Sequence, residues 1–446
     1  MKRRSVSPTR IIAVAFAVII LLGAVLLSLP VASRNGKSCG FVPALFTSTS
    51  ATCVTGLTLF DTWSQWSGFG QVVLILLIEV GGLGFMSAAS VFVFLLRQKV
   101  GLRQRMLMAQ SLNVDDMQSV VKLQKWVIIG SLSIQAVGAL ILFLRFLPAH
   151  GVAVAAKWGI FHSVSAFCNA GFDLFGSIAP GQSVTPFNGD WVVCLTLMVL
   201  IILGGLGFLV WEEVVRLKRF KRFSTYTKLV LVTSLGLILC GAAVILALEW
   251  NNPNTLGNMP ADEKILNGLF QSVTLRTAGF ASFDQNALTE GSKAVSIVLM
   301  LIGGSSGSTA GGMKTVTFVV IMLFLAARLR GRSTVTVFKR SIASTKLLDA
   351  MTLIISMVGL AMVGAVVICA TSGVSLTDAL FECASALGTV GLTTGVTSQL
   401  VLPTQLMIIL FMYFGRVGIL TLSLGFLMGS RAESRYQYAH TNIMIG

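Results

Sequence analysis

The sequence predicts an all-α polytopic membrane protein, in which four covalently linked units of span, pore loop and span surround a pseudo-fourfold pore. Three observations support this fold. The chain of 446 residues is 55% hydrophobic and only 11% charged, with a mean hydropathy of +0.86, which is too little charge to cover a soluble protein. Apolar runs of membrane-crossing length recur along it, and a short glycine-bearing segment occurs four times.

The apolar runs come in four pairs and give eight predicted spans. A helix needs about 20 residues to cross a hydrocarbon core of about 30 Å, and the first run is also too long for a cleaved signal. Uninterrupted runs occupy residues 11–29, 72–96, 127–144, 192–210, 229–248, 353–370 and 406–427. The eighth run, 294–327, is interrupted by IGGSSGSTAGGMKT (302–315).

The basic residues predict how the chain is oriented. Most of the 33 Lys and Arg residues lie in the N-terminus, in the linkers between the units and in the tail. By the positive-inside rule both termini are cytoplasmic, in the plasma membrane. The net charge of +16 then reflects topology and attraction to anionic lipid, with no nucleic-acid partner.

The same pattern sets the boundaries of the units. We expect them at 1–96, 126–217, 229–328 and 347–430. Cytoplasmic loops at 97–125, 218–228 and 329–346 join them, and a cytoplasmic tail follows at 431–446.

The repeated segment occurs once in each unit, as FTSTSATCVTGL (46–57), FHSVSAFCNAGF (161–172), FQSVTLRTAGF (270–280) and FECASALGTVGL (381–392). Each copy joins a helix-compatible stretch to a glycine, on the side poor in Lys and Arg. Stretches such as 43–52 and 155–167 are too short to cross twice, so we expect four re-entrant half-helices. Non-helical backbone survives at membrane depth only when it is buried in protein or faces water, which predicts a pore.

A second glycine cluster follows in the later span of each unit. It reads GGLG at 81–84, GGLG at 204–207, GGSSG at 303–307 and GRVG at 415–418. Two interpretations are equally good for this cluster: a role in the pore, or packing of small residues between helices.

The turns after the half-helices suit the binding of a dehydrated cation. Backbone carbonyls replace a hydration shell without the full counter-charge that would hold the ion too tightly. Aligning carbonyls often needs φ > 0, which glycine adopts at little cost. The C-terminal end of each half-helix adds a partial negative charge. Asp61, Asp173 and Asp284 follow three turns and either concentrate cations at the outer mouth or cap turns.

The four turns resemble the filter sequences of the Trk/Ktr/HKT superfamily of potassium transporters, and the resemblance covers essentially the whole chain. Eight spans look most like the Ktr membrane subunit. In that superfamily the backbone around the filter glycine binds K⁺, and glycine in all four places goes with a preference for K⁺ over Na⁺. The resemblance therefore implies K⁺ binding at the filter only, by Cys53, Val54, Thr55, Gly56, Cys168, Asn169, Ala170, Gly171, Arg276, Thr277, Ala278, Gly279, Gly388, Thr389, Val390 and Gly391.

The interrupted span has two interpretations. A phosphate-binding loop needs Lys directly after its last Gly, but Met313 follows Gly312 and no strand precedes the segment. A broken helix fits better, because each flanking apolar stretch is about half a bilayer long. The resemblance implies an intramembrane gating loop at 303–315. The residues expected to form the gate are Gly303, Gly304, Gly307, Gly311, Gly312 and Lys314.

Two charged residues inside predicted spans, Glu79 and Arg416, are assigned to the same gate. An isolated charge at mid-membrane costs roughly 2.5–3.5 kcal/mol on insertion scales, so each needs a partner or water. We expect that they pair with each other, or that Arg416 donates to carbonyls of the gating loop. Structural pairing without a gating role is the alternative.

Together these observations predict a channel-like K⁺ uptake protein that needs no cofactor. A catalytic function is not expected, because the sequence has no nucleophile–base constellation. The alternatives are a secondary transporter of another small solute and a membrane scaffold that conducts nothing. The resemblance implies a homodimer with a cytosolic nucleotide-binding ring subunit as regulator, and Na⁺ as a candidate coupling ion.

Overall fold

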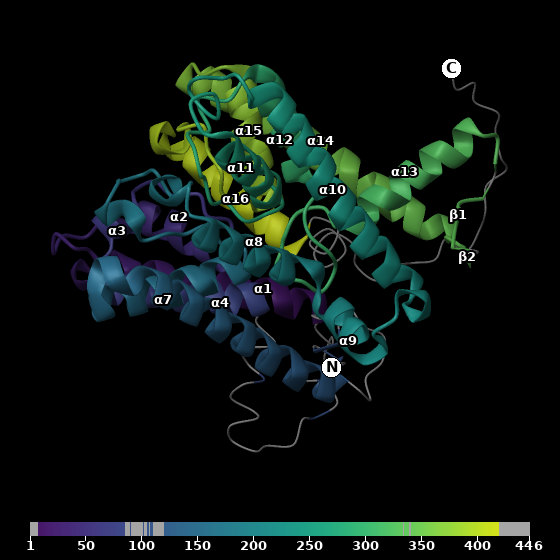
Figure 1. The fold of residues 1–446 in the computed structure, drawn as a ribbon, viewed down its shortest axis with the longest axis horizontal. Coiled ribbons are helices and arrows are strands. Elements are labelled where there is room, and N and C mark those ends of the chain that lie inside the picture. Colours follow the sequence, from purple (N-terminus) through teal and green to yellow (C-terminus); the bar gives the residue numbers. More distant parts are fainter. Residues whose placement is uncertain are drawn as a thin grey trace, which may run out of the picture.

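A computed structural model describes residues 8–84, 120–332, 334–338 and 340–418, with positions 90, 101, 105, 106, 108 and 109. Most of it is helical (Figure 1). The helices are α1 (Pro8–Ser28), α2 (Phe41–Thr52), α3 (Thr62–Gln65), α4 (Gly68–Leu83), α7 (Val120–Phe167), α8 (Trp191–Leu206), α9 (Phe208–Leu217), α10 (Thr225–Glu249), α11 (Ala261–Thr274), α12 (Glu290–Leu301), α13 (Thr315–Leu329), α14 (Ser344–Ser372), α15 (Leu376–Gly388) and α16 (Leu402–Val417). Strands β1 (Thr336–Val337) and β2 (Arg340–Ser341) pair antiparallel, with Thr336 opposite Ser341.

Several predicted segments fall partly or wholly outside the described residues. They are the end of the span at 72–96, most of the loop at 97–125, the end of the span at 406–427 and the tail at 431–446.

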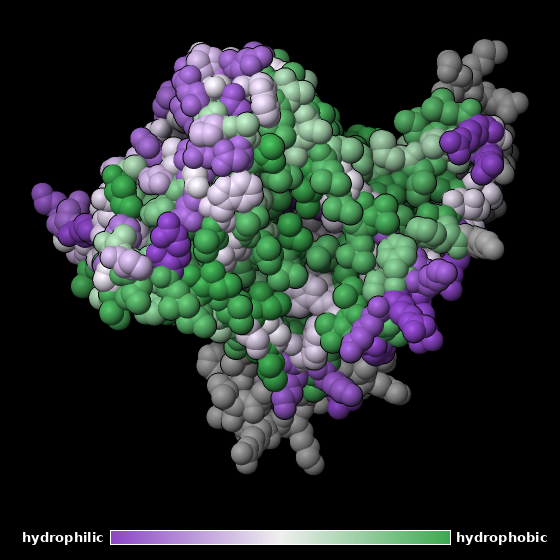
Figure 2. Space-filling model, in the orientation of Figure 1, coloured by the Kyte–Doolittle hydropathy of each residue, from purple (hydrophilic) through white to green (hydrophobic). Residues whose placement is uncertain are grey.

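Four helices, α1, α7, α10 and α14, are long and apolar enough to cross a membrane by themselves. Each of them begins one of the four predicted units. Large apolar side chains on their outer faces are exposed, including Leu22, Leu140, Leu235 and Val363. In Figure 2 hydrophobic residues cover the middle of the visible face, and hydrophilic residues gather toward opposite ends. This surface belongs to a multi-pass membrane protein.

Helix α7 combines a span and a half-helix. Its helical backbone is interrupted at Gly151, where φ is 73° and ψ is 168°. Residues 120–150 therefore form the span, and residues 152–167 form the second half-helix. The other three half-helices are α2, α11 and α15, so the helical stretches predicted at 43–52 and 155–167 are present.

In three of the later spans a helix ends at a glycine. The sequence predicts one continuous run at 192–210, but α8 ends at Leu206 and α9 begins at Phe208, at an angle of 96°. That prediction is wrong, because Gly207 has φ 96° and such a residue does not continue a right-handed helix. Helices α4 and α16 likewise end before Gly84 (φ 84°) and Gly418 (φ 92°).

Each half-helix packs against the preceding span through a small residue. In three units a serine hydroxyl donates to a carbonyl of the span at 2.7 Å; these serines are Ser48, Ser163 and Ser272. A glycine lies three residues after the accepting carbonyl, at Gly23, Gly138 and Gly241. A Cβ there would approach the serine Oγ to 2.3, 2.7 and 2.5 Å, respectively. In the fourth unit a Cβ built on Gly364 would lie 2.8 Å from the Cys383 sulfur.

These close contacts let helices approach within a membrane, where small residues and short hydrogen bonds replace the hydrophobic effect as the means of association. The phenylalanine that opens each repeated segment is buried in the resulting core. These residues are Phe46, Phe161, Phe270 and Phe381.

Replacing Gly138 with Leu should destabilise the protein, because the added Cβ would lie 2.7 Å from the Ser163 hydroxyl. Overpacking of this kind costs about 1–3 kcal/mol. The matched control is Gly130→Leu, on the same helix, where a Cβ meets nothing within 4 Å. We expect the Tm in detergent to fall by several degrees for Gly138→Leu only. Equal Tm values for the two variants would contradict the packing.

Candidate functional site

Four turns follow the half-helices and share one backbone conformation. In each turn two residues lie in the left-handed region, with one residue between them. The first has φ between 51° and 70° and is Val54, Asn169, Thr277 or Thr389. The second has φ between 69° and 98° and is Gly56, Gly171, Gly279 or Gly391. The four predicted quartets, 53–56, 168–171, 276–279 and 388–391, are therefore structurally equivalent; we call them the glycine turns.

A Ser or Thr near the end of each half-helix fixes the following turn. In the first unit the Ser50 carbonyl accepts from the Thr55 amide at 2.8 Å, and the Ser50 hydroxyl accepts from the Gly56 amide at 3.0 Å. The carbonyls of the equivalent residues also accept from turn amides. These equivalents are Ser165, Thr274 and Ser385. Such bonds hold the non-glycine left-handed residue of each turn, a conformation that costs roughly 1–2 kcal/mol.

The glycine turns meet one another in a closed cycle. A Cβ built on Gly56 would lie 2.6 Å from the carbonyl oxygen of Ala170, in the second turn. Gly171, Gly279 and Gly391 stand in the same relation to the turn that follows each of them around the cycle. A Cβ on Gly171 would lie 2.7 Å from the Ala278 carbonyl oxygen. A Cβ on Gly279 would lie 2.3 Å from that of Val390, and a Cβ on Gly391 would lie 2.2 Å from that of Thr55. Only glycine fits at these four positions, because φ is positive and a carbonyl oxygen of the next turn occupies the space that a Cβ would need.

The 303–315 loop joins α12 to α13, and its first and last residues lie side by side. The Gly303 amide donates to the Met313 carbonyl at 2.8 Å, and the Thr315 amide donates to the Gly304 carbonyl at 3.0 Å. The Arg276 guanidinium reaches both ends, lying 3.4 Å from the Gly303 carbonyl oxygen and 3.1 Å from the Thr315 hydroxyl. The break predicted in this span is therefore present, with its two ends held together.

The middle of this loop runs from the second glycine turn to the fourth. The Thr309 hydroxyl donates to the carbonyl of Phe167, the residue before the second turn, at 3.1 Å. Two residues later, a Cβ on Gly311 would lie 2.2 Å from the Thr389 hydroxyl oxygen. The second and fourth turns are opposite members of the cycle, so residues 309–311 cross it on the side where the half-helices end.

Two further loop glycines contact other units. The Gly307 carbonyl accepts from the Phe208 amide at 2.8 Å, and the Gly312 amide donates to the Gly415 carbonyl at 3.2 Å. Both glycines have positive φ, of 68° and 63°.

Two positively charged side chains donate hydrogen bonds to carbonyls of residues 309–311, the part of the loop that crosses the cycle. Arg416 donates to the Thr309 carbonyl and to the carbonyls of Gly81 and Gly82, the last at 3.0 Å. Lys314 donates to the Ala310 carbonyl at 2.7 Å. Of the two arrangements expected for Arg416, the structure contains the bond to a loop carbonyl.

Glu79 lies elsewhere and has different partners. It accepts from the Gln135 amide at 3.0 Å and from the Cys168 thiol at 3.4 Å. Among the described residues it forms no ion pair with Arg416. Through Cys168, the first residue of the second glycine turn, Glu79 contacts that turn.

The second glycine cluster packs against the ends of the half-helices. A Cβ on Gly81, Gly204 or Gly415 would lie within 2.3 Å of a carbonyl oxygen at such an end. The oxygens belong to Thr52, Phe167 and Leu387. Of the two interpretations of this cluster, close packing therefore applies to its first glycine, and the last glycine ends a helix.

The acids that follow the turns mostly cap local structure. Asp61 accepts from the Ser64 amide at 2.8 Å, and Asp284 accepts from the Asn286 amide at 2.9 Å. Asp173 is half-buried in the loop after the second turn. Burial and the nearby Asp61 carboxylate raise the pKa of Asp173 to about 7. Near neutral pH these three acids therefore carry less negative charge than three free carboxylates would give.

Polar residues of the half-helices bond to the chain that follows the turns, and sequence reasoning assigned none of them to the site. The position after each repeated phenylalanine is polar: Thr47, His162, Gln271 and Glu382. His162 is buried and accepts from the Leu174 amide at 3.1 Å, and Gln271 donates to Gln285 at 2.6 Å. Glu382 accepts from the hydroxyls of Thr393 and Thr397. The aligned repeats contain this signal, because the same position is polar in all four copies.

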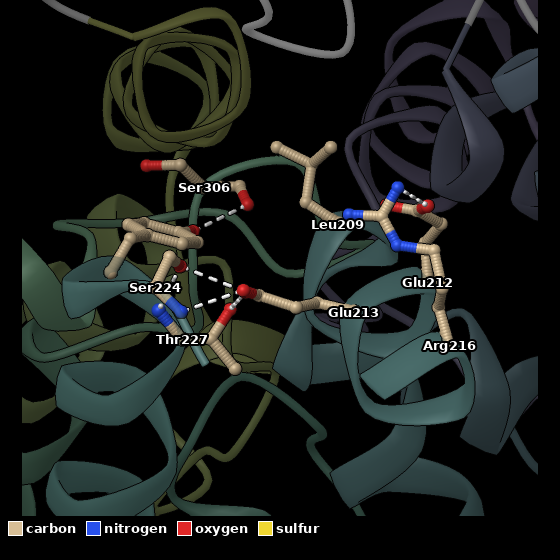
Figure 3. A pocket seen from close by; sticks show the side chains of 8 residues that line it. Leu209, Glu212, Glu213, Arg216, Ser224, Thr227 and Ser306 are labelled. Atoms are coloured by element: carbon tan, nitrogen blue, oxygen red, sulfur yellow. Dashed lines mark hydrogen bonds and ion pairs between the residues drawn. The ribbon is translucent and has the colours of Figure 1, made fainter. Parts of the chain in front are cut away.

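A cavity of about 350 Å³ lies between α9, the start of α10 and the 303–315 loop (Figure 3). Glu213 points into it and accepts from the Ser224 amide at 2.6 Å and from the Ser224 hydroxyl at 2.8 Å. Tyr226 also lines this cavity, and its hydroxyl donates to the Ser306 carbonyl at 2.9 Å. The loop is thus held from this side as well.

Comparison with known proteins gives the family. A family model described as a cation transport protein, TrkH, matches residues 2–436. The chain is 38% identical to the potassium/sodium uptake protein NtpJ of Enterococcus hirae, over 100% of this chain and 98% of the relative. It is also 38% identical to the Ktr system potassium uptake protein B of Bacillus subtilis, over 96% of this chain and 95% of the relative.

The fold is shared with a solved structure, that of the potassium transporter TrkH from Vibrio parahaemolyticus. The TM-score is 0.74 at 18% identity, over 95% of this chain and 86% of that one. With its apolar spans, its glycine turns and a family match along almost its whole length, the chain belongs to the TrkH family of cation transport proteins, within the Trk/Ktr superfamily, and is a transporter, not an enzyme.

Proposed function

We propose that this protein takes up K⁺ across the plasma membrane through the centre of the four glycine turns. The observation that carries the proposal is the closed cycle, in which each filter glycine adjoins a carbonyl of the next turn. The four units, with the boundaries predicted from the sequence, then surround one pore in pseudo-fourfold order. The names of the two relatives, which are potassium or potassium/sodium uptake proteins, support the same activity.

The chemistry of the turns suits a dehydrated K⁺ ion. Each quartet offers main-chain carbonyls, which replace water around the ion without binding it as a carboxylate would. The four half-helices end at the turns, and each contributes roughly half an elementary negative charge at its C-terminus. Na⁺ is a candidate second ion, as driver or activator.

The 303–315 loop is the gate in this proposal. It crosses the cycle at residues 309–311, directly on the path of an ion leaving the filter. Among the residues that the structure describes, the bonding partners of Arg416 and Lys314 are carbonyl oxygens, which carry partial charges, so the positive field of the two side chains opposes a cation. Opening requires these bonds to break and the loop glycines to change conformation.

The protein is proposed to work as a homodimer with both termini in the cytoplasm. A cytosolic nucleotide-binding ring subunit would regulate it, docking on the basic loops around 97–125, 216–228 and 328–346 and on the tail. The "Ktr system" in the name of one relative supports a multi-subunit complex.

Uptake of ⁸⁶Rb⁺ into proteoliposomes tests the proposed pathway. Gly279→Ala should lower it at least about tenfold, because the methyl group would lie 2.3 Å from the Val390 carbonyl oxygen and distort the filter. Gly373→Ala is the matched control, since Gly373 also has positive φ (65°) but a Cβ there meets nothing within 4 Å. Wild-type protein that transports no Rb⁺, or two variants that transport equally, would refute the pathway.

Neutralising the gate should increase flux. Arg416→Gln removes the charge and the bonds to the Thr309, Gly81 and Gly82 carbonyls, so we expect Rb⁺ uptake by the isolated membrane protein to rise several-fold. Lys314→Gln provides a second, independent variant. Arg328→Gln, which lies outside the pathway over the Phe324 ring, is the control. Unaltered flux in folded Arg416→Gln and Lys314→Gln proteins would assign both cations a structural role.

A further inference from the structure

The first left-handed residue of the four glycine turns is Val, Asn, Thr and Thr in chain order, and the side chains of the second and third turns meet. The carboxamide oxygen of Asn169, in the second turn, accepts from the Thr277 hydroxyl, in the third turn, at 3.2 Å. Both residues are buried. Val54, at the equivalent place in the first turn, has no polar side-chain atom. The Thr389 hydroxyl in the fourth turn is buried and has no hydrogen-bond partner among the described residues. The direct side-chain link thus joins the second and third turns.

The nitrogen of the same carboxamide donates to two main-chain carbonyls outside the second turn. It donates to the carbonyls of Phe167, at 3.3 Å, and Ile201, at 3.2 Å. Phe167 ends the second half-helix, and Ile201 lies on α8. Both donor directions and one acceptor direction of the carboxamide are therefore occupied by groups of the protein, which holds the amide in one orientation.

Thr309 of the 303–315 loop also contacts Asn169 and its hydrogen-bond partner Phe167. The Thr309 hydroxyl donates to the Phe167 carbonyl and lies 3.4 Å from the Asn169 carboxamide. The Thr309 amide also donates to the Gly204 carbonyl at 3.2 Å, and a Cβ on Gly204 would lie 2.8 Å from the same carboxamide. Asn169 is thus in contact with two glycine turns, one later span and the loop.

We infer that Asn169 is a positioning residue that determines ion specificity by fixing the spacing of the second and third glycine turns while the 303–315 loop is seated. This inference rests on the proposed function, since it concerns the same filter. Selection of K⁺ over Na⁺ depends on how many carbonyls surround the ion and how freely they move inward. A link between adjacent turns limits that movement, and the Thr309 contact makes the link depend on the position of the loop.

The link predicts coupled effects on selectivity. Asn169→Leu and Thr277→Val each remove it, and Thr309→Val removes the contribution of the loop. One buried hydrogen bond is worth enough to change a ratio of two ions by about three- to tenfold. We expect each variant to lower the ratio of ⁸⁶Rb⁺ to ²²Na⁺ uptake by that amount. The Asn169→Leu/Thr277→Val double variant should match the single variants, because both remove the same bond.

Proteoliposomes with equal amounts of monodisperse protein provide the measurement. The control is Thr371→Val, whose exposed hydroxyl bonds only to carbonyls of its own helix. A purely structural role for Asn169 would lower uptake of both ions together and leave the ratio unchanged. Thr277→Val nearly preserves side-chain shape, so it remains decisive if Asn169→Leu does not fold.

The outcomes separate the inference from the proposed function. Wild-type protein that takes up Rb⁺ selectively, with variants of unchanged ratio, would overturn the role of Asn169 alone. Additive effects in the double variant would also overturn it, because they would mean that the two side chains act separately. Wild-type protein without Rb⁺ uptake would overturn the pathway and this inference with it.

Discussion

One steric constraint underlies the structure: at four places in the chain, a carbonyl oxygen of the next turn occupies the space that a side chain would need. Four half-helices can bring their ends this close only if glycine stands at each contact. Main-chain dipoles gathered at one place repel each other, so they need support from outside. Ser50 and its equivalents supply it through hydrogen bonds, and the serine–glycine contacts hold the half-helices against the first spans.

Close packing at glycine also determines how the later spans meet the half-helices. Gly81, Gly204 and Gly415 let the later spans approach the ends of the half-helices, and Gly207 then turns the chain away. The 303–315 loop lies between the second and fourth turns, where no continuous helix would fit. In the proposed gate, filter and loop are therefore not separate devices: the Thr309 hydroxyl and the Asn169 carboxamide share the Phe167 carbonyl.

Much of this arrangement could be predicted from the sequence, and the rest could not for identifiable reasons. The half-helices and the quartets could be predicted because the four repeats coincide with the hydropathy pattern. The break at Gly207 was not, because GGLG within an apolar run reads equally well as helix packing. The partners of Arg416 are main-chain carbonyls, which leave no trace in a sequence, and Glu79 is bonded to Gln135 on a helix that reads as apolar. Contacts such as Asn169 with Thr277 depend on how two distant turns meet.

Locating a heavy monovalent cation in the protein is the most direct test of the central claim. Crystals of the purified protein grown in Rb⁺ would provide an anomalous difference map. A filter built from the four glycine turns predicts its strongest peaks on the axis enclosed by Gly56, Gly171, Gly279 and Gly391. Peaks bound elsewhere in the membrane region, with none inside that cycle, would contradict it.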